Sequence, residues 1–98
     1  MADVFHALSS PVRRKILAML KARDMTAGEI AEQLDVGKST LSGHFNVLKS
    51  ADLVTTERSG TTITYSLNTS VVEEMLALVA GIFGTNDEEG SQSNDGKA

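Results

Sequence analysis

The chain has 98 residues, of which 41% are hydrophobic and 22% are charged, and these proportions are ordinary for one soluble globular domain. It has no cysteine, which excludes disulfides, thiolate metal sites, thiol redox switches and cysteine nucleophiles. It also shows no secretion leader and no apolar run near the roughly 18–20 residues that a membrane span requires, so we expect a cytoplasmic protein.

The formal net charge of −4 is unevenly distributed along the chain. Residues 84–98 contain four acidic residues, one lysine and no large apolar side chain, and a segment of this composition cannot bury enough surface to fold. We therefore expect a disordered acidic tail there. Residues 1–83 contain nine acidic and eight basic residues, so this single domain is close to neutral and can still present a local basic face to DNA.

Two local signals predict the first two helices. Val4, Phe5 and Leu8 stand at helical spacing and predict a short helix that begins near residue 3. Ser10 followed by Pro11 predicts the start of a second helix, because a serine caps free N–H groups and proline fits the first helical position. The apolar stripe of this second helix continues to about residue 22.

The third and fourth predicted helices are separated by a gap of only three residues. Thr26 and Glu29 have the spacing of a capping box, which begins the third helix. The fourth begins near residue 38, and its inward face carries three apolar residues at positions i, i+4 and i+7, namely Leu41, Phe45 and Leu48.

After the fourth helix the hydrophobic period changes from 3.6 to 2. Residues 53–57 and 62–67 are rich in β-branched residues and predict two strands, and residues 58–61 between them predict a hairpin tip with Gly60 free to take a positive φ. A last helix begins at residue 69 or 70. The predicted order ααααββα is mainly α with a β-hairpin wing, which is a winged helix-turn-helix.

Several motifs then resemble one family. Residues 5–17 read FHALSSPVRRKIL and resemble the F-x-A-L-[SA]-[DS]-P-x-R-x-x-I-L opening of the ArsR/SmtB family of bacterial winged-helix repressors. Residues 26–31 and 39–48 resemble the helix-turn-helix of that family, with its S-x-H-L motif present as Ser42-Gly43-His44-Phe45. Residues 54–67 resemble its wing and terminal Y-x-L. The resemblance covers about residues 2–83 and is greatest to the small metal-independent autorepressors.

The outward face of the fourth predicted helix is the candidate DNA-reading surface. It is polar and free of carboxylates, so it can approach phosphates without repulsion, and the N-terminus of the helix favours an anion. A solvated helix face is the alternative interpretation. The residues that we predict to contact DNA are Lys38, Ser39, Thr40, Ser42, Gly43, His44 and Asn46 of this helix, and Arg58 of the hairpin tip.

Three of these residues have competing interpretations. The resemblance implies a larger polar residue at the position of Gly43, so either the backbone approaches DNA closely there or base reading is weaker. His44 could be a metal ligand, a packing residue or a DNA contact, and the resemblance favours a contact with phosphate or base. Arg58 suits a minor-groove or phosphate contact, with a solvated turn residue as the alternative. For Arg13 the resemblance implies a partly structural role.

The last predicted helix carries two apolar stripes, whereas a surface helix of a monomer requires one. The surplus predicts a partner surface, and the resemblance implies a symmetric dimer made by the first and last helices. The residues that we predict in this interface are Val4, Phe5, Leu8, Val72, Met75, Leu76, Val79 and Phe83. Paired recognition helices would then lie roughly 34 Å apart, one DNA turn, on a palindrome.

No metal site and no cofactor are predicted. In the family, metal sensors place cysteines where this chain has Thr26 and Gly28, and others use the last helix, where this chain offers Glu73 and Glu74. The sequence also lacks a paired carboxylate, a nucleophile with a base and a phosphate loop, so we do not expect an enzyme.

We therefore expect a DNA-binding and dimerisation domain over residues 1–83 that acts as a homodimeric repressor on a palindromic operator of double-stranded DNA. An inducer or an antirepressor protein would relieve the repression. The alternative is a winged-helix protein-interaction module without DNA binding, which the acidic net charge and Gly43 would permit.

Overall fold

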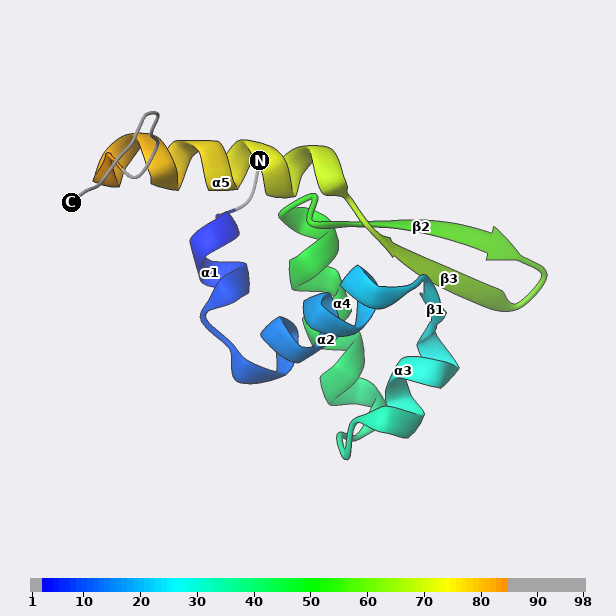
Figure 1. Ribbon diagram of the computed structural model, residues 1–98. Helices are drawn as coiled ribbons and strands as arrows, with labels where there is room; N and C mark the ends of the chain where they lie inside the picture. The colour runs from blue at the N-terminus through cyan, green and yellow to red at the C-terminus, as the bar shows by residue number, and fades with distance from the viewer. Residues whose placement is uncertain (1–2, 85–98) are drawn as a thin grey trace.

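The computed structural model describes residues 3–84 and consists of a helical body with one small antiparallel sheet (Figure 1). The predicted winged helix-turn-helix is confirmed, with one added strand. The elements in chain order are α1 (Val4–Leu8), α2 (Pro11–Ala22), β1 (Met25–Thr26), α3 (Ala27–Gln33), α4 (Lys38–Ser50), β2 (Val54–Ser59), β3 (Thr62–Leu67) and α5 (Thr69–Phe83). The sequence pattern did not predict β1, because two residues are too few to establish a period of 2.

The sheet has the order β1-β3-β2, so β3 is its central strand. β2 pairs with β3 from Val54 opposite Leu67 to Ser59 opposite Thr62. The hairpin loop is therefore only Gly60 and Thr61, and the φ of +63° at Gly60 fits a two-residue turn whose twist matches the strands. The prediction that residues 58–61 form the tip was wrong in this respect, since the paired ladder continues through residues 58 and 59.

The helix boundaries follow from caps that the sequence carries. Oγ of Ser10 accepts a hydrogen bond from the N–H of Arg13 at 3.3 Å, with Pro11 at the first helical position. The capping box is present as predicted, with Thr26 and Glu29 each bonding the backbone N–H of the other at 2.9–3.1 Å.

α5 begins at residue 69 as expected, but its cap is Asn68, whose Oδ1 accepts from the N–H of Val71 at 3.5 Å. At the other end, Gly84 caps α5 with a φ of +65°, so this residue belongs to the helix end rather than to the predicted tail. The rest of that tail, residues 85–98, lies outside the described part of the chain.

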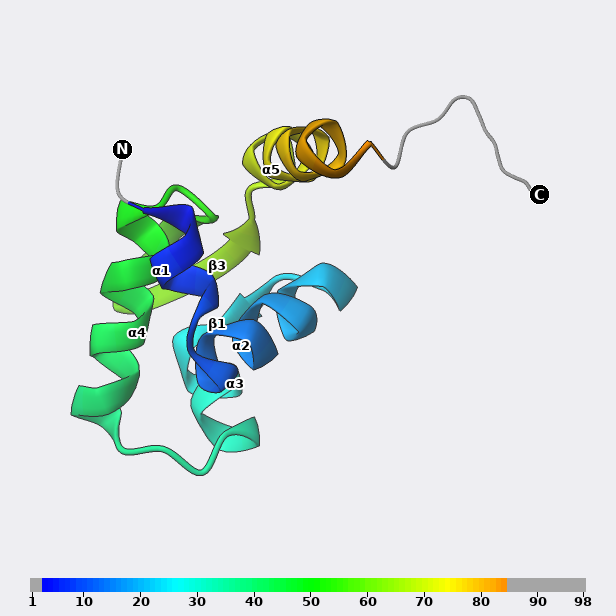
Figure 2. The same ribbon diagram turned by 90° about the vertical axis from the view of Figure 1, so that its left-hand side faces the viewer.

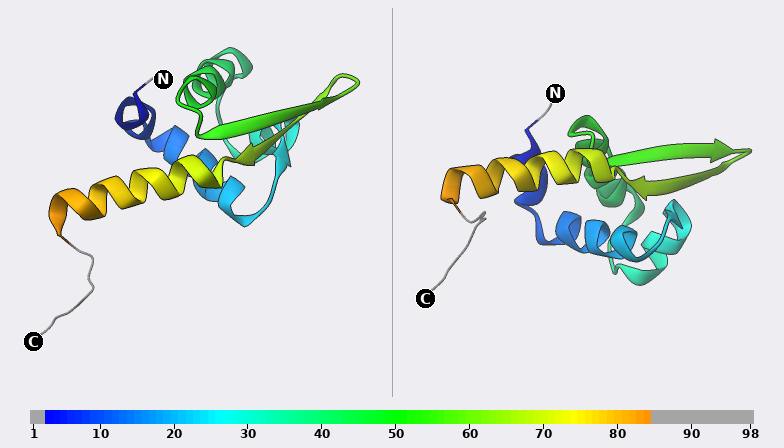
Figure 3. Two further views of the ribbon diagram at one scale, coloured as in Figure 1. Left: turned by 90° about the horizontal axis from the view of Figure 1, so that it is seen from above. Right: turned by 45° about the horizontal axis from the view of Figure 1, so that its top comes forward.

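The core lies between α2, α3, α4 and the sheet. The three predicted inward residues of α4, Leu41, Phe45 and Leu48, are all buried, together with Ile16 of α2 and Ile30 of α3. α5 contains no buried residue. It extends to one side of the body while the β2–β3 hairpin extends to the other (Figures 1 and 3), and a view nearly along α5 shows it standing apart from α4 (Figure 2).

The turn after α4 contains a strained residue. Asp52 has a φ of +60°, and the N–H groups of Asp52 and Leu53 bond back to the carbonyls of Lys49 and Leu48 at 2.9 and 3.1 Å. This is a Schellman motif with aspartate at the position where glycine is usual. The carboxylate also lies at the negative end of the helix dipole.

We expect Asp52→Gly to raise the free energy of unfolding by about 0.5–1 kcal/mol, since the gain from a relaxed left-handed conformation exceeds the added entropy of the unfolded chain. Asp52→Val is the control, because a β-branched residue is worse at positive φ. Urea unfolding of the three proteins checks this. A lower midpoint for the glycine variant than for the native chain would show that the aspartate is stabilising.

Candidate DNA-binding surface

The outward face of α4 is exposed and carries no carboxylate, because all thirteen residues of this helix are apolar, polar or basic. Gly37 at the N-cap provides no side-chain cap, so the first N–H groups of the helix are available to an anion such as a phosphate. Of the predicted contact residues, six are exposed on this face: Lys38, Ser39, Thr40, Ser42, Gly43 and Asn46. His44 is half-buried.

An aromatic stack holds α4 against the wing. The rings of Phe45 on α4 and Tyr65 on β3 lie with centroids 4.2 Å apart and planes inclined by 20°. Both side chains are buried, and burial raises the pKa of the Tyr65 phenol. Because Tyr65 also pairs with β1 and β2 at Met25 and Thr56, the stack fixes the helix and the hairpin relative to each other. The two predicted DNA-contacting elements thus form one rigid unit.

Gly43 leaves the centre of the outward face without a side chain. A Cβ built at this position would meet nothing within 4 Å in the described structure, so packing within the protein does not require glycine there. A helix-interior glycine costs about 1 kcal/mol relative to alanine. Steric packing inside the domain therefore does not explain the glycine at position 43.

His44 is hydrogen-bonded to Arg13. The distance from Nη1 of Arg13 to Nδ1 of His44 is 3.0 Å. Desolvation by burial, followed by the positive charge of Arg13, lowers the pKa of His44 below its usual value of 6.5, so the imidazole is neutral at neutral pH. A contact of His44 with DNA would therefore be made by a neutral ring.

Arg13 makes more contacts than the sequence indicated. It is only 7% exposed and is the single buried charged side chain among residues 3–84. Its Nε and Nη2 donate to the carbonyls of Ala7 and His6 at 2.8 and 3.0 Å, which ties α2 to the end of α1. The structural role that the resemblance implied is thus present. No pattern in the sequence indicated the bond to His44, which lies 31 residues away.

Arg58 lies in β2 opposite Ile63 and not in the turn. It is exposed, as are all residues of β2 after Val54. One residue pair separates it from the loop, so it still lies near the far end of the hairpin. Its side chain and that of Glu57 point to opposite faces of the sheet, because neighbouring residues of a strand alternate between the faces.

A second surface is apolar and lies on the two terminal helices. All large hydrophobic side chains that are exposed in residues 3–84 lie there, at 54–73% exposure: Phe5 of α1, and Leu76, Leu78, Ile82 and Phe83 of α5. We call these five residues the terminal apolar surface. Of the predicted interface residues, Val4, Leu8, Val72, Met75 and Val79 are half-buried beside it. Leu78 and Ile82 were missing from the predicted interface set.

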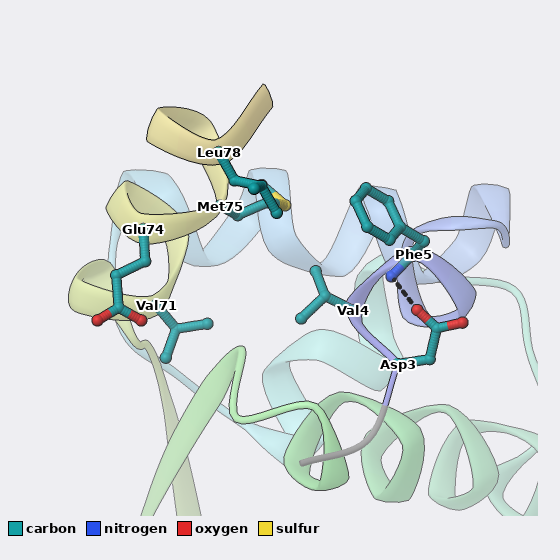
Figure 4. A pocket seen from close by; sticks show the side chains of 7 residues that line it. All are labelled: Asp3, Val4, Phe5, Val71, Glu74, Met75 and Leu78. Atoms are coloured by element: carbon teal, nitrogen blue, oxygen red, sulfur yellow. Dashed lines mark hydrogen bonds between the residues drawn. The ribbon is translucent and has the colours of Figure 1, made fainter. Parts of the chain in front are cut away.

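A groove of about 340 Å³ runs between α1 and α5 within this surface (Figure 4). Val4 and Phe5 face it from α1, and Val71, Met75 and Leu78 face it from α5. The two helices therefore do not close on each other in a single chain, and apolar area is left open to a further partner.

No three His, Asp or Glu side chains within residues 3–84 come together as metal ligands would. In the same part of the chain, no helix combines the length and the hydrophobicity that a bilayer-spanning segment requires.

Known proteins are similar to this chain in sequence and in fold. Residues 8–57 match the family described as a helix-turn-helix domain. The transcriptional repressor SdpR of Bacillus subtilis is 43% identical over 89 residues, which cover 91% of this chain and 99% of that protein. An ArsR-like transcriptional regulator from Rhodococcus sp. RHA1 superposes with a TM-score of 0.76 at 28% identity, covering 84% of this chain and 75% of that one. NolR from Sinorhizobium fredii gives a TM-score of 0.66 at 32% identity, covering 82% and 80%. The chain therefore belongs to the ArsR/SmtB-type winged-helix transcriptional regulators, which are DNA-binding regulators and not enzymes.

Proposed function

We propose that this chain is a cytoplasmic repressor that binds a palindromic operator as a homodimer and does so without a metal ion. The observation that supports DNA reading most directly is the exposed, carboxylate-free face of α4, held rigidly to the wing by the stack of Phe45 on Tyr65. A helix with free N–H groups at its N-terminus and short polar side chains on its first turns is suited to the major groove. The similarity to a transcriptional repressor of Bacillus subtilis and to a transcriptional regulator from Rhodococcus also supports DNA binding.

The terminal apolar surface supports the dimer. Five large apolar side chains exposed on two helices form a patch of a kind that monomers rarely leave open. In a two-fold dimer each patch would cover the other, and the two α4 helices would lie roughly 34 Å apart on successive major grooves. The operator would then be a palindrome with half-sites one turn apart.

Base discrimination is proposed to be modest. Gly43 contributes no side chain at the middle of the reading face, so fewer base edges are contacted directly. Sequence-dependent shape and flexibility of the DNA would supply part of the specificity.

A gel shift with the upstream region of the chain's own gene tests the proposal. We expect a specific complex that survives excess scrambled duplex and that contains two chains per operator. If no complex forms with either duplex in low salt, the chain is better described as a protein-interaction module. The exposed Gly43 and the net charge of −4 favour that second candidate.

Zinc is expected to leave operator binding unchanged. The described residues offer no cluster of three ligands, and zinc sites in proteins use three or four. Operator affinity measured with added zinc, and again with a chelator, should agree within error. Release of the operator by zinc at micromolar concentration would contradict metal independence.

Arg58→Ala is expected to weaken binding to cognate and scrambled DNA alike. An exposed guanidinium near the hairpin end would neutralise about one phosphate, so its loss should reduce the slope of log K against log salt by roughly 0.9. Affinity across a salt series checks this. Thr55→Ala, at an exposed position at the other end of β2, is the control. An unchanged slope for Arg58→Ala would mean that the wing does not touch the backbone.

A further inference from the structure

The bond between Arg13 and His44 fixes the proton of the histidine ring. Arginine carries only donors and does not lose its proton at physiological pH. Nδ1 of His44, 3.0 Å from Nη1 of Arg13, must therefore be the acceptor. A neutral ring with a lone pair on Nδ1 carries its proton on Nε2.

The guanidinium cannot turn away from His44 easily. Its other two bonds run to the carbonyls of His6 and Ala7 in the last turn of α1, and the carbonyl of His6 also accepts from the backbone N–H of Ser9. With 7% exposure the group is shielded from water, so losing any of these three bonds would leave a buried polar atom unsatisfied. The two bonds to α1 hold the guanidinium of Arg13 in place, and Arg13 in turn holds the ring of His44.

Nε2 of His44 has no hydrogen-bond partner among residues 3–84. His44 is half-buried, and Thr40, one helical turn before it on the same side of α4, is exposed. An N–H donor pairs with a phosphate oxygen or with an acceptor on a base edge, such as O6 or N7 of guanine or O4 of thymine. It does not pair with the amino groups of cytosine or adenine.

We infer that Arg13 is a positioning residue for DNA recognition, which acts by holding His44 as an Nε2–H donor for an acceptor on the DNA. This inference rests on the proposed function, because it requires that α4 contact DNA. Arg13 itself touches no DNA in this arrangement. If Arg13 had only a structural role, it would stabilise the packing of α1 and α2 but would not determine which ring nitrogen of His44 carries the proton and donates to DNA.

Two substitutions at His44 separate the two nitrogens. The side-chain amide of glutamine reaches the place of Nε2 and can donate there, whereas that of asparagine reaches only the place of Nδ1. We expect His44→Gln to keep operator affinity within about threefold of the native chain, and His44→Asn to lose roughly tenfold or more, as His44→Ala does. Equal losses for the glutamine and asparagine variants, in a native chain that binds its operator, would overturn the inference and leave the proposed function intact.

The ring proton can be measured without DNA. Nitrogen NMR of the full-length chain labelled at histidine should show His44 as the Nε2–H form, and Arg13→Lys should change the Nδ1 resonance because the single ammonium nitrogen of lysine cannot make the three bonds that the guanidinium makes. A ring protonated at Nδ1 in the native chain overturns the inference. If the Arg13→Lys chain does not fold, the native spectrum and the two His44 variants carry the test. Failure of the native chain to bind any DNA would instead overturn the proposed function, with the NMR result unaffected.

Discussion

Leu76→Glu will convert the protein into monomers that no longer hold the operator. Leu76 is 58% exposed in the single chain, so the charge is tolerated there, but the proposed dimer would bury it on both subunits. Each lost leucine burial is worth about 2 kcal/mol, and two symmetric copies give about 4 kcal/mol before any charge is buried, or roughly a thousandfold in the dimer dissociation constant. Because one half-site alone binds weakly, operator affinity should fall with dimerisation.

Sedimentation at micromolar concentration, followed by operator titration, checks this result. Ala77→Glu is a matched control, because Ala77 is exposed on the same helix but on the side of Glu73, away from both apolar stripes. It should remain dimeric. A native chain that sediments as a monomer at micromolar concentration would contradict the dimer itself, and a dimeric Leu76→Glu variant would contradict this interface.

Thr40→Ala combined with Ser42→Ala should reduce affinity for the operator by at least about 30-fold and relax the preference at particular base pairs. Both hydroxyls are exposed on the first two turns of α4, where a recognition helix contacts base edges, and each lost specific contact costs about 1–3 kcal/mol. Binding to scrambled DNA should change little, since neither residue carries a charge.

Ser50→Ala is the control for these two substitutions. It makes the same chemical change at an exposed residue of α4, but at the last position of the helix. Affinity for cognate and scrambled duplexes across a salt series separates specific from electrostatic effects. If Ser42→Ala and His44→Ala both leave cognate affinity unchanged, α4 is not the reading helix and the interaction-module alternative takes precedence.

Local signals in the sequence predicted most of the fold. Ser10-Pro11, the Thr26–Glu29 capping box and the spacing of Leu41, Phe45 and Leu48 each depend on residues within a few positions of one another, and the structure contains all three. Their success follows from the short range of the interactions that produce them.

The errors concern pairing between distant segments. β1 exists only because Met25 and Thr26 lie opposite Tyr65 and Thr64, about forty residues further along, and a two-residue strand has no pattern of its own. Arg58 was assigned to the turn because strand length depends on how far the partner strand continues. The bond from Arg13 to His44 was not predicted for the same reason, since it joins α2 to α4 across 31 positions, with β1 and α3 between them in the chain.

The exposure of α5 in the single chain also affects how the amount of this protein in the cell would be controlled. None of its fifteen residues is buried in the single chain, and an isolated helix of this length is only marginally stable in water. The start of α5 packs on the core of its own chain through Val71 and Val72. In the proposed dimer the rest of the helix gains its packing from the second subunit, so its order depends on protein concentration. At low expression the chains would separate, α5 would fray, and proteases would gain access to an apolar segment. Dilution during growth would then release the protein from the operator and also shorten its lifetime. Because both effects act in the same direction, the proposed repression would end sharply once the amount of protein fell below a threshold.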